Sequence, residues 1–418
     1  MVESELAARV WSKENLHKAW LKVSSSSRTS ASRTIRREAE WFGHQVLAKI
    51  NSLCSRLSMG IFEFSPSKGI FMQRAGKSDR PIVVAPIENK IVQRAILNVV
   101  NNSDSLSQMV KTQFSFGGIY DTTDRRNVGT AVDALRGGIE AGLTWYVKSD
   151  IRDFFVGIPR EKVVDAVRSR VSDEKFLNLF ERAVAVELDN MIELGADAEA
   201  FPIHETGVAQ GCCLSPFIGN ALLKDFDRKM NDRGVRCLRY IDDFLILAPS
   251  RGAALGAFKA AKKLLSGFGL SVHDPEAPNS KTKVGSVTEG IEFLGVEVRG
   301  KVVRPSNESR VRLLQKIKSL VNESVATFGA PSKGYAAGVS LSRTLRRIDG
   351  TITGWVGQYK FCNDQKVLAS LNKSIDEQIS KYLRAYGDAR KRLQANDRRA
   401  SRELLGVRYL VPEDWSNR

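Results

Sequence analysis

Three aspartates are the residues best placed to carry chemistry, because each lies beside apolar, β-prone residues. Asp242 and Asp243 are adjacent, with Tyr240-Ile241 before them and the apolar residues 244–247 after them. Two turn-favouring acids between apolar runs predict a tight β-hairpin. Carboxylates held so close to a buried sheet need a positive charge nearby to offset their own, and a divalent cation is the strongest local source of positive charge. A hairpin whose acidic turn has no function is the alternative for this stretch taken alone.

A second strand-like run, residues 145–155, contains Asp150. Two-metal phosphoryl transfer requires carboxylates from separate strands that converge on two ions about 3.5–4 Å apart. Asp150 together with Asp242 and Asp243 would form such a cradle. Between these segments, residues 207–221 contain a Gln-Gly turn and a Ser-Pro pair that opens an apolar, helix-like run. Such a turn lets the backbone approach a ligand closely.

The three segments together resemble motifs A, B and C of reverse transcriptases, with residues 240–243 as the Tyr-X-Asp-Asp box. The resemblance extends from about Arg80 to about Tyr359. It implies an α+β right-hand polymerase with fingers, a palm made of an antiparallel sheet plus helices, and a helical thumb. It also implies RNA-directed DNA synthesis by two-metal phosphoryl transfer. The implied ligands of two Mg²⁺ ions, with Mn²⁺ as the alternative, are Asp150, Asp242, Asp243 and the backbone carbonyl of Ile151.

The resemblance also implies a nucleotide pocket. Residues 76–95 are similar to the fingers motif of group II intron-type reverse transcriptases, so Lys77 and Arg80 are candidates for binding the incoming triphosphate. Arginine offers phosphate oxygens a planar fork, whereas lysine offers a point charge. Gln210 and Gly211 would shape the pocket. An exposed basic turn without a ligand is the alternative for the two cations.

Phe155 lies after Asp150 where reverse transcriptases place a bulky gate beneath the sugar. An aromatic wall there would clash with a 2′-hydroxyl and favour deoxynucleotides; ordinary core packing is the alternative. Upstream, residues 113–120 resemble the segment that precedes motif A in the group II lineage, but this copy has Gly117-Gly118 and lacks the arginine.

Two further motifs follow the aspartate hairpin. Residues 279–283 resemble motif D, in which a lysine protonates the pyrophosphate leaving group as a general acid. Lys281 matches best, and Lys283 is the alternative. Residues 290–298 resemble the primer-grip hairpin, centred on Phe293, Leu294 and Gly295. Residues 345–359 are similar to the Gly-Trp…Tyr segment of the thumb in group II-type enzymes.

Composition restricts the class of protein. A chain of 418 residues, 42% of them hydrophobic, is too long for one compact core and predicts two or three subdomains. The five cysteines show no Cys-x-x-Cys spacing, which argues against structural zinc and against disulfides and fits a reducing cytoplasm. No apolar run reaches the roughly 18 residues of a membrane span, so we expect no membrane partner and a cytoplasmic location.

The net charge of +17 is unevenly placed, with Lys and Arg in excess at both ends of the chain and acids slightly in excess in the middle. An acidic centre between basic flanks suits an enzyme that gathers metal centrally and grips a polyanion on both sides. The expected partners are an RNA template, an RNA/DNA hybrid and dNTPs. Basic surfaces that serve solubility alone are the alternative.

The expected subdivision is an N-terminal helical extension (1–58), fingers (59–145), a palm (146–304) with a helical insertion near 159–200, a helical thumb (305–395) and a basic tail (396–418). Residues 24–32 predict a flexible serine-rich connector, and residues 33–57 one helix whose core face includes Trp41 and Leu47. Residues 65–69 predict the turn of a β-hairpin, and residues 173–195 predict a helix. The four histidines are scattered and are expected to be structural or exposed.

Two other functions compete with a reverse transcriptase. An RNA-binding maturase that helps an intron fold would not need the intact carboxylate cradle. An RNA-dependent RNA polymerase would share the carboxylates but usually has a smaller or polar residue at the position of Phe155. Among reverse transcriptases, the chain looks like the bacterial "unknown group" linked to phage defence. That likeness implies a structured noncoding RNA, encoded nearby, as the template.

Overall fold

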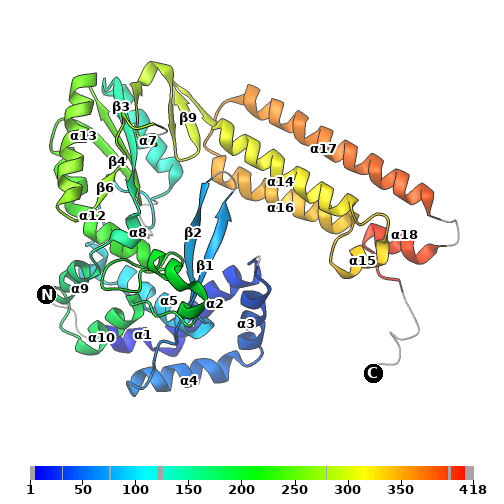
Figure 1. Cartoon of the computed structure of the whole chain (residues 1–418), viewed down its shortest axis with the longest axis horizontal. Helices are drawn as coiled ribbons and strands as arrows, with labels where there is room; N and C mark the ends of the chain where they lie inside the picture. Colours follow the sequence, from blue (N-terminus) through cyan, green and yellow to red (C-terminus); the bar gives the residue numbers. More distant parts are fainter. Residues whose placement is uncertain are drawn as a thin grey trace. The chain divides into compact units, whose positions relative to one another are not determined.

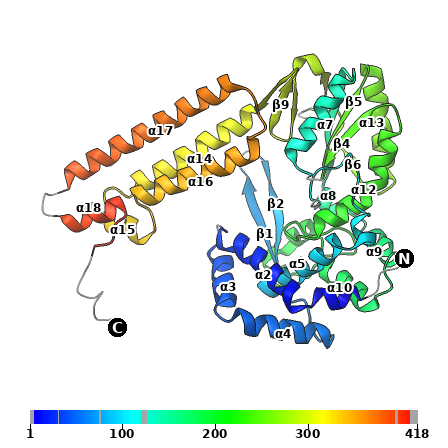
Figure 2. The same ribbon diagram turned by 180° about the vertical axis from the view of Figure 1, so that it is seen from behind.

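The structure of the protein is a computed structural model that describes residues 5–30, 32–74, 77–119, 126–278, 280–393 and 397–409. The chain divides into two compact units, Met1–Ser286 and Val287–Arg418, and each has its own hydrophobic core. Figure 1 and Figure 2 show the elements of both units from opposite sides. Within the described ranges, no helix is both long enough and apolar enough to cross a bilayer.

The first unit begins with four helices. They are α1 (Leu6–Val10), α2 (Lys13–Arg28), α3 (Arg33–Gly43) and α4 (Val46–Ser58). The predicted serine-rich connector is wrong, because its first half continues α2. Ser24 and Ser27 are buried on the inner face of α2, and the Ser26 hydroxyl donates to the Val23 carbonyl at 2.9 Å. Serine hydroxyls that donate to carbonyls of the preceding turn are compatible with a helix. The serine-rich composition therefore did not end α2 at residue 24.

The predicted single helix over residues 33–57 is two helices, because the chain breaks at His44-Gln45 between α3 and α4. The break shifts the helical period, so the expected core face is wrong at two positions. Trp41 is 61% exposed and Leu47 is 71% exposed, whereas Phe42 is fully buried. The Lys49 ammonium lies 3.3 Å from the centre of the Trp41 ring and covers this exposed face.

An antiparallel pair follows, formed by β1 (Lys68–Arg74) and β2 (Lys77–Val84), with register from Lys68↔Val84 to Arg74↔Lys77. The two strands therefore follow one another between Arg74 and Lys77, with residues 75–76 outside the described residues, and the turn predicted at residues 65–69 is wrong. Ser67 instead exchanges backbone bonds with Glu187 and Asp189, at 2.7 and 2.9 Å. The turn-prone residues 65–69 therefore belong to a segment that pairs with residues 187–189, and they do not form the turn of the hairpin. The next elements are α5 (Ile87–Asn101), α6 (Asp104–Ser107) and α7 (Val128–Glu140).

The first unit contains a five-stranded antiparallel sheet with strand order β4-β5-β3-β6 and with β7 paired to β3. Its strands are β3 (Trp145–Arg152), β4 (Arg236–Tyr240), β5 (Asp243–Ala248), β6 (Ser271–Val272) and β7 (Lys283–Ser286). The long helices α12 (Ser215–Asn231) and α13 (Arg251–Ser266) pack with it, as Figure 1 shows. Rings of Phe226, Phe244 and Phe258 join these helices to β5.

Short helices connect β3 to α12. They are α8 (Phe154–Gly157), α9 (Arg160–Arg168), α10 (Glu174–Val184), α11 (Met191–Leu194) and a 3₁₀ turn (Gly195–Ala200). The helix predicted over residues 173–195 is thus too long, because α10 ends at Val184. The residues after it become extended and pair with the segment around Ser67. The apolar pattern continues beyond Val184, but the pairing of these residues with the segment around Ser67 ends α10 there.

The second unit opens with a 3₁₀ turn (Val287–Glu289) and a three-stranded antiparallel sheet, followed by helices. The strands are β8 (Ile291–Phe293), β9 (Val296–Arg299) and β10 (Val302–Pro305), in the order β10-β9-β8. The helices are α14 (Asn307–Val325), α15 (Pro331–Ala336), α16 (Leu341–Tyr359), α17 (Gln365–Arg392) and α18 (Arg398–Leu405). Ile317, Ile348 and the fully buried Tyr382 lie in their shared core.

Candidate active site

The three aspartates predicted to act together lie at one end of the central sheet. Asp150 on β3 is the cross-strand partner of Asp243 on β5. Tyr240 pairs with Asp243, so Ile241 and Asp242 form a two-residue loop between β4 and β5. The Ile151 amide donates to the Asp242 carbonyl at 3.0 Å, which fixes this loop against β3. Residues separated by almost a hundred positions are therefore neighbours, as the sequence predicted.

The carboxylates are partly buried and repel one another. Burial raises the pKa of Asp243 to about 6, and the charges of Asp242 and Asp150 add to this shift, whereas Lys148 and Lys281 oppose it. Burial also raises the pKa of Asp242, with Asp150 adding and the cations of Arg80 and Lys281 opposing. Clustered acids that resist ionisation need a nearby positive charge.

Two cationic or ionisable groups contact Asp150. Lys281 Nζ lies 2.7 Å from its Oδ2, and His273 Nε2 lies 3.5 Å from its Oδ1. The other predicted lysine, Lys283, is in β7 opposite Lys148, so of the two candidates it is Lys281 that contacts Asp150 among the described residues. His273 was expected to be structural or exposed, and the structure places it directly after β6, which pairs with Ile151. Its contact with Asp150 had no signal in the sequence, because it depends on that strand pairing.

The chemistry of these side chains fits a hard divalent cation. Within the described residues, Asp150 Oδ1 is buried and accepts no hydrogen bond, with His273 Nε2 3.5 Å away, so this oxygen can still accept a positive ligand. Oxygen ligands with negative charge are those that Mg²⁺ prefers. Among the described residues, no three Asp, Glu, His or Cys side chains are already grouped as a metal site. The Lys281 ammonium holds the other oxygen of Asp150 and would have to share it with an ion.

The predicted nucleotide-pocket residues come from three segments. Arg80 is on β2 with an exposed side chain, and its charge acts on Asp242. Lys77 starts β2, but its side chain lies outside the described part of the molecule. The Val83 amide donates to the Gln210 carbonyl at 2.9 Å. Gly211 has φ +116°, and a Cβ there would lie 2.8 Å from the Val83 carbonyl, so this turn needs glycine.

Phe155 is in α8, the short helix that directly follows β3. Its ring is half-buried, with its centre 5.3 Å from that of Phe154, and its carbonyl accepts from the Val208 amide at 2.7 Å. The backbone of α8 is thereby tied to the segment that leads to Gln210. The position suits a wall of a pocket, and its role as a sugar gate stays a prediction.

The predicted primer-grip residues belong to the second unit. Phe293 ends β8 and is fully buried, so any contact with a primer would fall to Leu294 and Gly295 in the turn. Both turn residues have positive φ, +52° and +78°. A Cβ on Gly295 would lie 2.9 Å from the Tyr359 hydroxyl, so the end of α16 packs over the turn.

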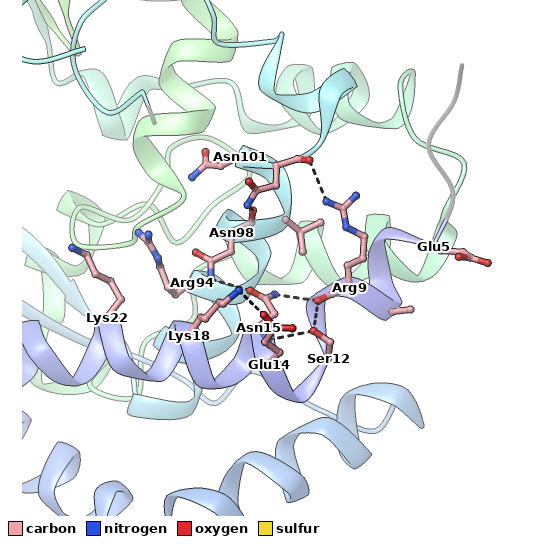
Figure 3. A pocket seen from close by; sticks show the side chains of 13 residues that line it. Glu5, Arg9, Ser12, Glu14, Asn15, Lys18, Lys22, Arg94, Asn98 and Asn101 are labelled. Carbon is pink, nitrogen blue, oxygen red and sulfur yellow. Dashed lines mark hydrogen bonds and ion pairs between the residues drawn. The ribbon is translucent and has the colours of Figure 1, made fainter. Parts of the chain in front are cut away.

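A polar cavity of about 780 Å³, lined by α1, α2 and α5, contains none of the three aspartates (Figure 3). The asparagines in it bond internally; Asn98 donates to Asn15 at 2.9 Å, and Asn15 donates to the Ala95 carbonyl at 3.0 Å. Lys22 and Arg94 line both this cavity and a neighbouring one of about 330 Å³ that reaches Gly211. The Arg94 Nε is buried and has no hydrogen-bond partner among the residues that the structure describes.

Residues 72–298 match the family described as "Reverse transcriptase (RNA-dependent DNA polymerase)", which is more than half of the chain. The chain therefore belongs to the reverse transcriptases, the family of RNA-directed DNA polymerases. The α+β fold and the paired aspartates on adjacent strands agree with this class.

Among curated proteins, "Protein YkfC" of Escherichia coli (strain K12) is 20% identical over 319 residues, covering 68% of this chain and 79% of that protein. The "Putative COX1/OXI3 intron 2 protein" of Saccharomyces cerevisiae is 23% identical over 194 residues, or 45% of this chain. The match spans about a fifth of that intron protein's length. Among solved structures, a telomerase from Candida albicans has a TM-score of 0.42 at 12% identity, covering 83% of this chain and 64% of that one. A partial Cas6-RT-Cas1–Cas2 complex has a TM-score of 0.36 at 17% identity, covering 63% of this chain and 43% of that one.

Proposed function

We propose that the protein copies RNA into DNA with Asp150, Asp242 and Asp243 as its catalytic carboxylates. The observation that carries this proposal is the cross-strand pairing of Asp150 with Asp243 next to the Ile241–Asp242 loop. It brings three acids from two distant segments to one end of the sheet in a chain of the reverse transcriptase family. Positioning and charge neutralisation are the main requirements of phosphoryl transfer.

The residues that would hold Mg²⁺, or Mn²⁺ in its place, are the three aspartates and the backbone carbonyl of Ile151. When bound, the ions would lower the pKa of the attacking 3′-hydroxyl and neutralise the triphosphate. Arg80 and Lys77 on β2 would bind the triphosphate oxygens. The Gln210–Gly211 turn, held against Val83, would leave room for the nucleotide beside the backbone.

Lys281 is the proposed general acid. Its ammonium lies 2.7 Å from Asp150, so its proton is already at the edge of the carboxylate cluster. Side-chain exposure of 66% leaves Lys281 free to turn toward a leaving pyrophosphate and donate that proton. In the second unit, Leu294 and Gly295 are the proposed contacts to the primer.

The decisive test replaces Asp242 and Asp243 together with asparagine. We expect dNTP incorporation on an RNA template to fall below detection, because two neutral amides lack the negative charge with which the carboxylates would hold two divalent cations. Circular dichroism would show that the fold is kept. Undiminished incorporation by the folded double variant would contradict the proposal.

Competition between dNTPs and NTPs would test Phe155 as the gate against the 2′-hydroxyl. Preferential incorporation of NTPs would identify an RNA polymerase instead.

A maturase-like function is the second candidate, favoured by the similarity to proteins of the cob and COX1/OXI3 introns. In that case the chain would bind an intron RNA and help it fold, whatever its polymerase activity. RNA recovered by crosslinking, followed by a splicing assay with and without the protein, separates the two functions. Splicing that depends on the protein but survives loss of the aspartates would favour the maturase.

For the template we propose a structured noncoding RNA encoded near the gene in a bacterium, and for the biological role we propose defence against phage. The support is the resemblance to the unknown-group enzymes, the net charge of +17, and the cationic cavities beside α2. Sequencing of the cDNA that copurifies with the protein identifies the template. A phage challenge of cells that carry the wild-type or the double-asparagine variant tests the role.

A further inference from the structure

An arginine lies fully buried one strand position before the Tyr-X-Asp-Asp box. Arg239 on β4 is 0% exposed, and its partner Asp227 on α12 is 1% exposed. Arg239 Nε and Nη2 donate to the two oxygens of Asp227 at 2.7 and 2.6 Å, a two-pronged ion pair. The remaining nitrogen, Nη1, donates to the Asn220 side chain at 2.8 Å and to the Ile241 carbonyl at 2.9 Å. One guanidinium thus joins α12 to the loop that bears Asp242.

That loop has a backbone conformation which needs support. Ile241 has φ +60°, the left-handed region, which a β-branched residue adopts rarely. Such conformations persist where the surroundings hold them, and they gather at active sites. Gly117 and Gly118 leave the space that the Ile241 side chain occupies; a Cβ on either would lie 2.9 Å from it. Gly117 and Gly118, where this chain departs from the family pattern, are thus explained by the space that the Ile241 side chain needs.

We propose that Arg239, held by Asp227, is a positioning residue that keeps Ile241 in its left-handed conformation and so directs Asp242 and Asp243 toward Asp150. The proposal rests on the proposed polymerase function. Arg239 reaches the loop through the Ile241 carbonyl, and the Ile151 amide holds the next carbonyl, that of Asp242, from the other side at 3.0 Å. The loop is therefore fixed on both sides by hydrogen bonds from different segments.

A role in stability alone would not account for this pair. Replacement of both members of a buried ion pair by apolar residues is often neutral or stabilising, because the charges no longer have to be desolvated. Such a replacement removes the donor to the Ile241 carbonyl while keeping the interior filled. Stability and positioning can therefore be separated in one variant.

The test compares wild type with the paired variant Arg239→Met, Asp227→Leu. We expect an unchanged or higher melting temperature without metal, a kcat about a hundredfold lower, and a KM for dNTP within about threefold of wild type. The rise in melting temperature on adding Mn²⁺ should shrink, because the carboxylates no longer converge. As control, Leu238→Ala on the same strand should lower the melting temperature but keep kcat and the Mn²⁺ response.

Wild-type kcat together with a wild-type Mn²⁺ response in the folded paired variant would overturn the proposal. Should that variant not fold, Arg239→Lys serves instead, since one ammonium cannot hold both Asp227 oxygens and the Ile241 carbonyl. It should fold and lose kcat, and full kcat in it would overturn the proposal equally. A wild-type protein without any dNTP incorporation would refute the polymerase function instead, and the Mn²⁺ response would still report on the loop.

Discussion

Two tight hairpins, β4–β5 in the first unit and β8–β9 in the second, both have two-residue loops but serve opposite purposes. Each has a two-residue loop whose first residue is apolar with positive φ: Ile241 at +60° and Leu294 at +52°. The second loop residue is Asp242 in one and Gly295 in the other. In the first hairpin the positive φ falls on a β-branched residue, Ile241, and the loop carries one acid, Asp242, with Asp243 opening β5; in the second hairpin glycine adopts its positive φ without strain.

The surroundings of the two loops explain this difference. Around the first loop lie buried acids, the cations of Lys281 and Arg80, and a carboxylate oxygen without a hydrogen bond. Around the second loop lie the buried Phe293 and the Tyr359 hydroxyl. The first hairpin holds charge in place at the expense of stability, and the second adds stability through packing. Four predictions test this contrast, from the largest expected effect to the smallest.

Asp243→Asn should separate activity from stability in the first hairpin. We expect incorporation to fall at least about a thousandfold, since a metal ligand is lost. Because the pKa of Asp243 is raised to about 6, its charged form destabilises the folded, metal-free protein above that pH. The variant should therefore be more stable at pH 8 by up to about 3 kcal/mol.

The sign of this effect can be checked by urea unfolding in EDTA. The advantage of the Asp243→Asn variant should shrink as the pH falls from about 6 to about 4, where the wild-type carboxyl gains its proton in the folded state first. A variant less stable than wild type at pH 8 would show that the carboxylate already has a favourable partner in the fold.

Phe293→Ala should produce the opposite pattern in the second hairpin. Removal of a fully buried ring leaves a cavity, so we expect a loss of about 3–5 kcal/mol in the free energy of unfolding. Denaturant unfolding of the whole protein, followed by hydrogen exchange, would place the loss in residues 287–418. A loss below about 1 kcal/mol would mean that this hairpin is not a packing element.

Lys281→Gln and Lys283→Gln form a matched pair near the first hairpin. Loss of a general acid should lower kcat about a hundredfold for Lys281→Gln. Lys283 is exposed on β7 and has no contact with Asp150 among the described residues, so its variant should stay within about twofold of wild type. Equal effects of the two substitutions would remove Lys281 from the mechanism.

Gly118→Ala and Gly142→Ala measure the crowding beside Ile241. Both glycines have positive φ. A Cβ on Gly118 would lie 2.5 Å from Pro216 and 2.9 Å from Ile241, whereas a Cβ on Gly142 would have no atom of the described residues within 4 Å. We expect about 1 kcal/mol of destabilisation from the backbone alone at Gly142 and about 2 kcal/mol or more at Gly118. Thermal melts give both values, and equal losses would mean that the loop yields to the added methyl group.

From the sequence alone, the aspartate hairpin, the partnership of Asp150 with Asp242 and Asp243, and most helices of the second unit were predictable. Periodic apolar runs and a chemically specific motif are local signals, and they do not depend on what packs against them. Only the tertiary structure decided where α10 ends, that Trp41 is exposed, and that His273 and Lys281 contact Asp150. It alone also revealed the bond from Arg239 to the Ile241 carbonyl. These features depend on pairing and burial between distant segments, whose free energies outweigh local preference.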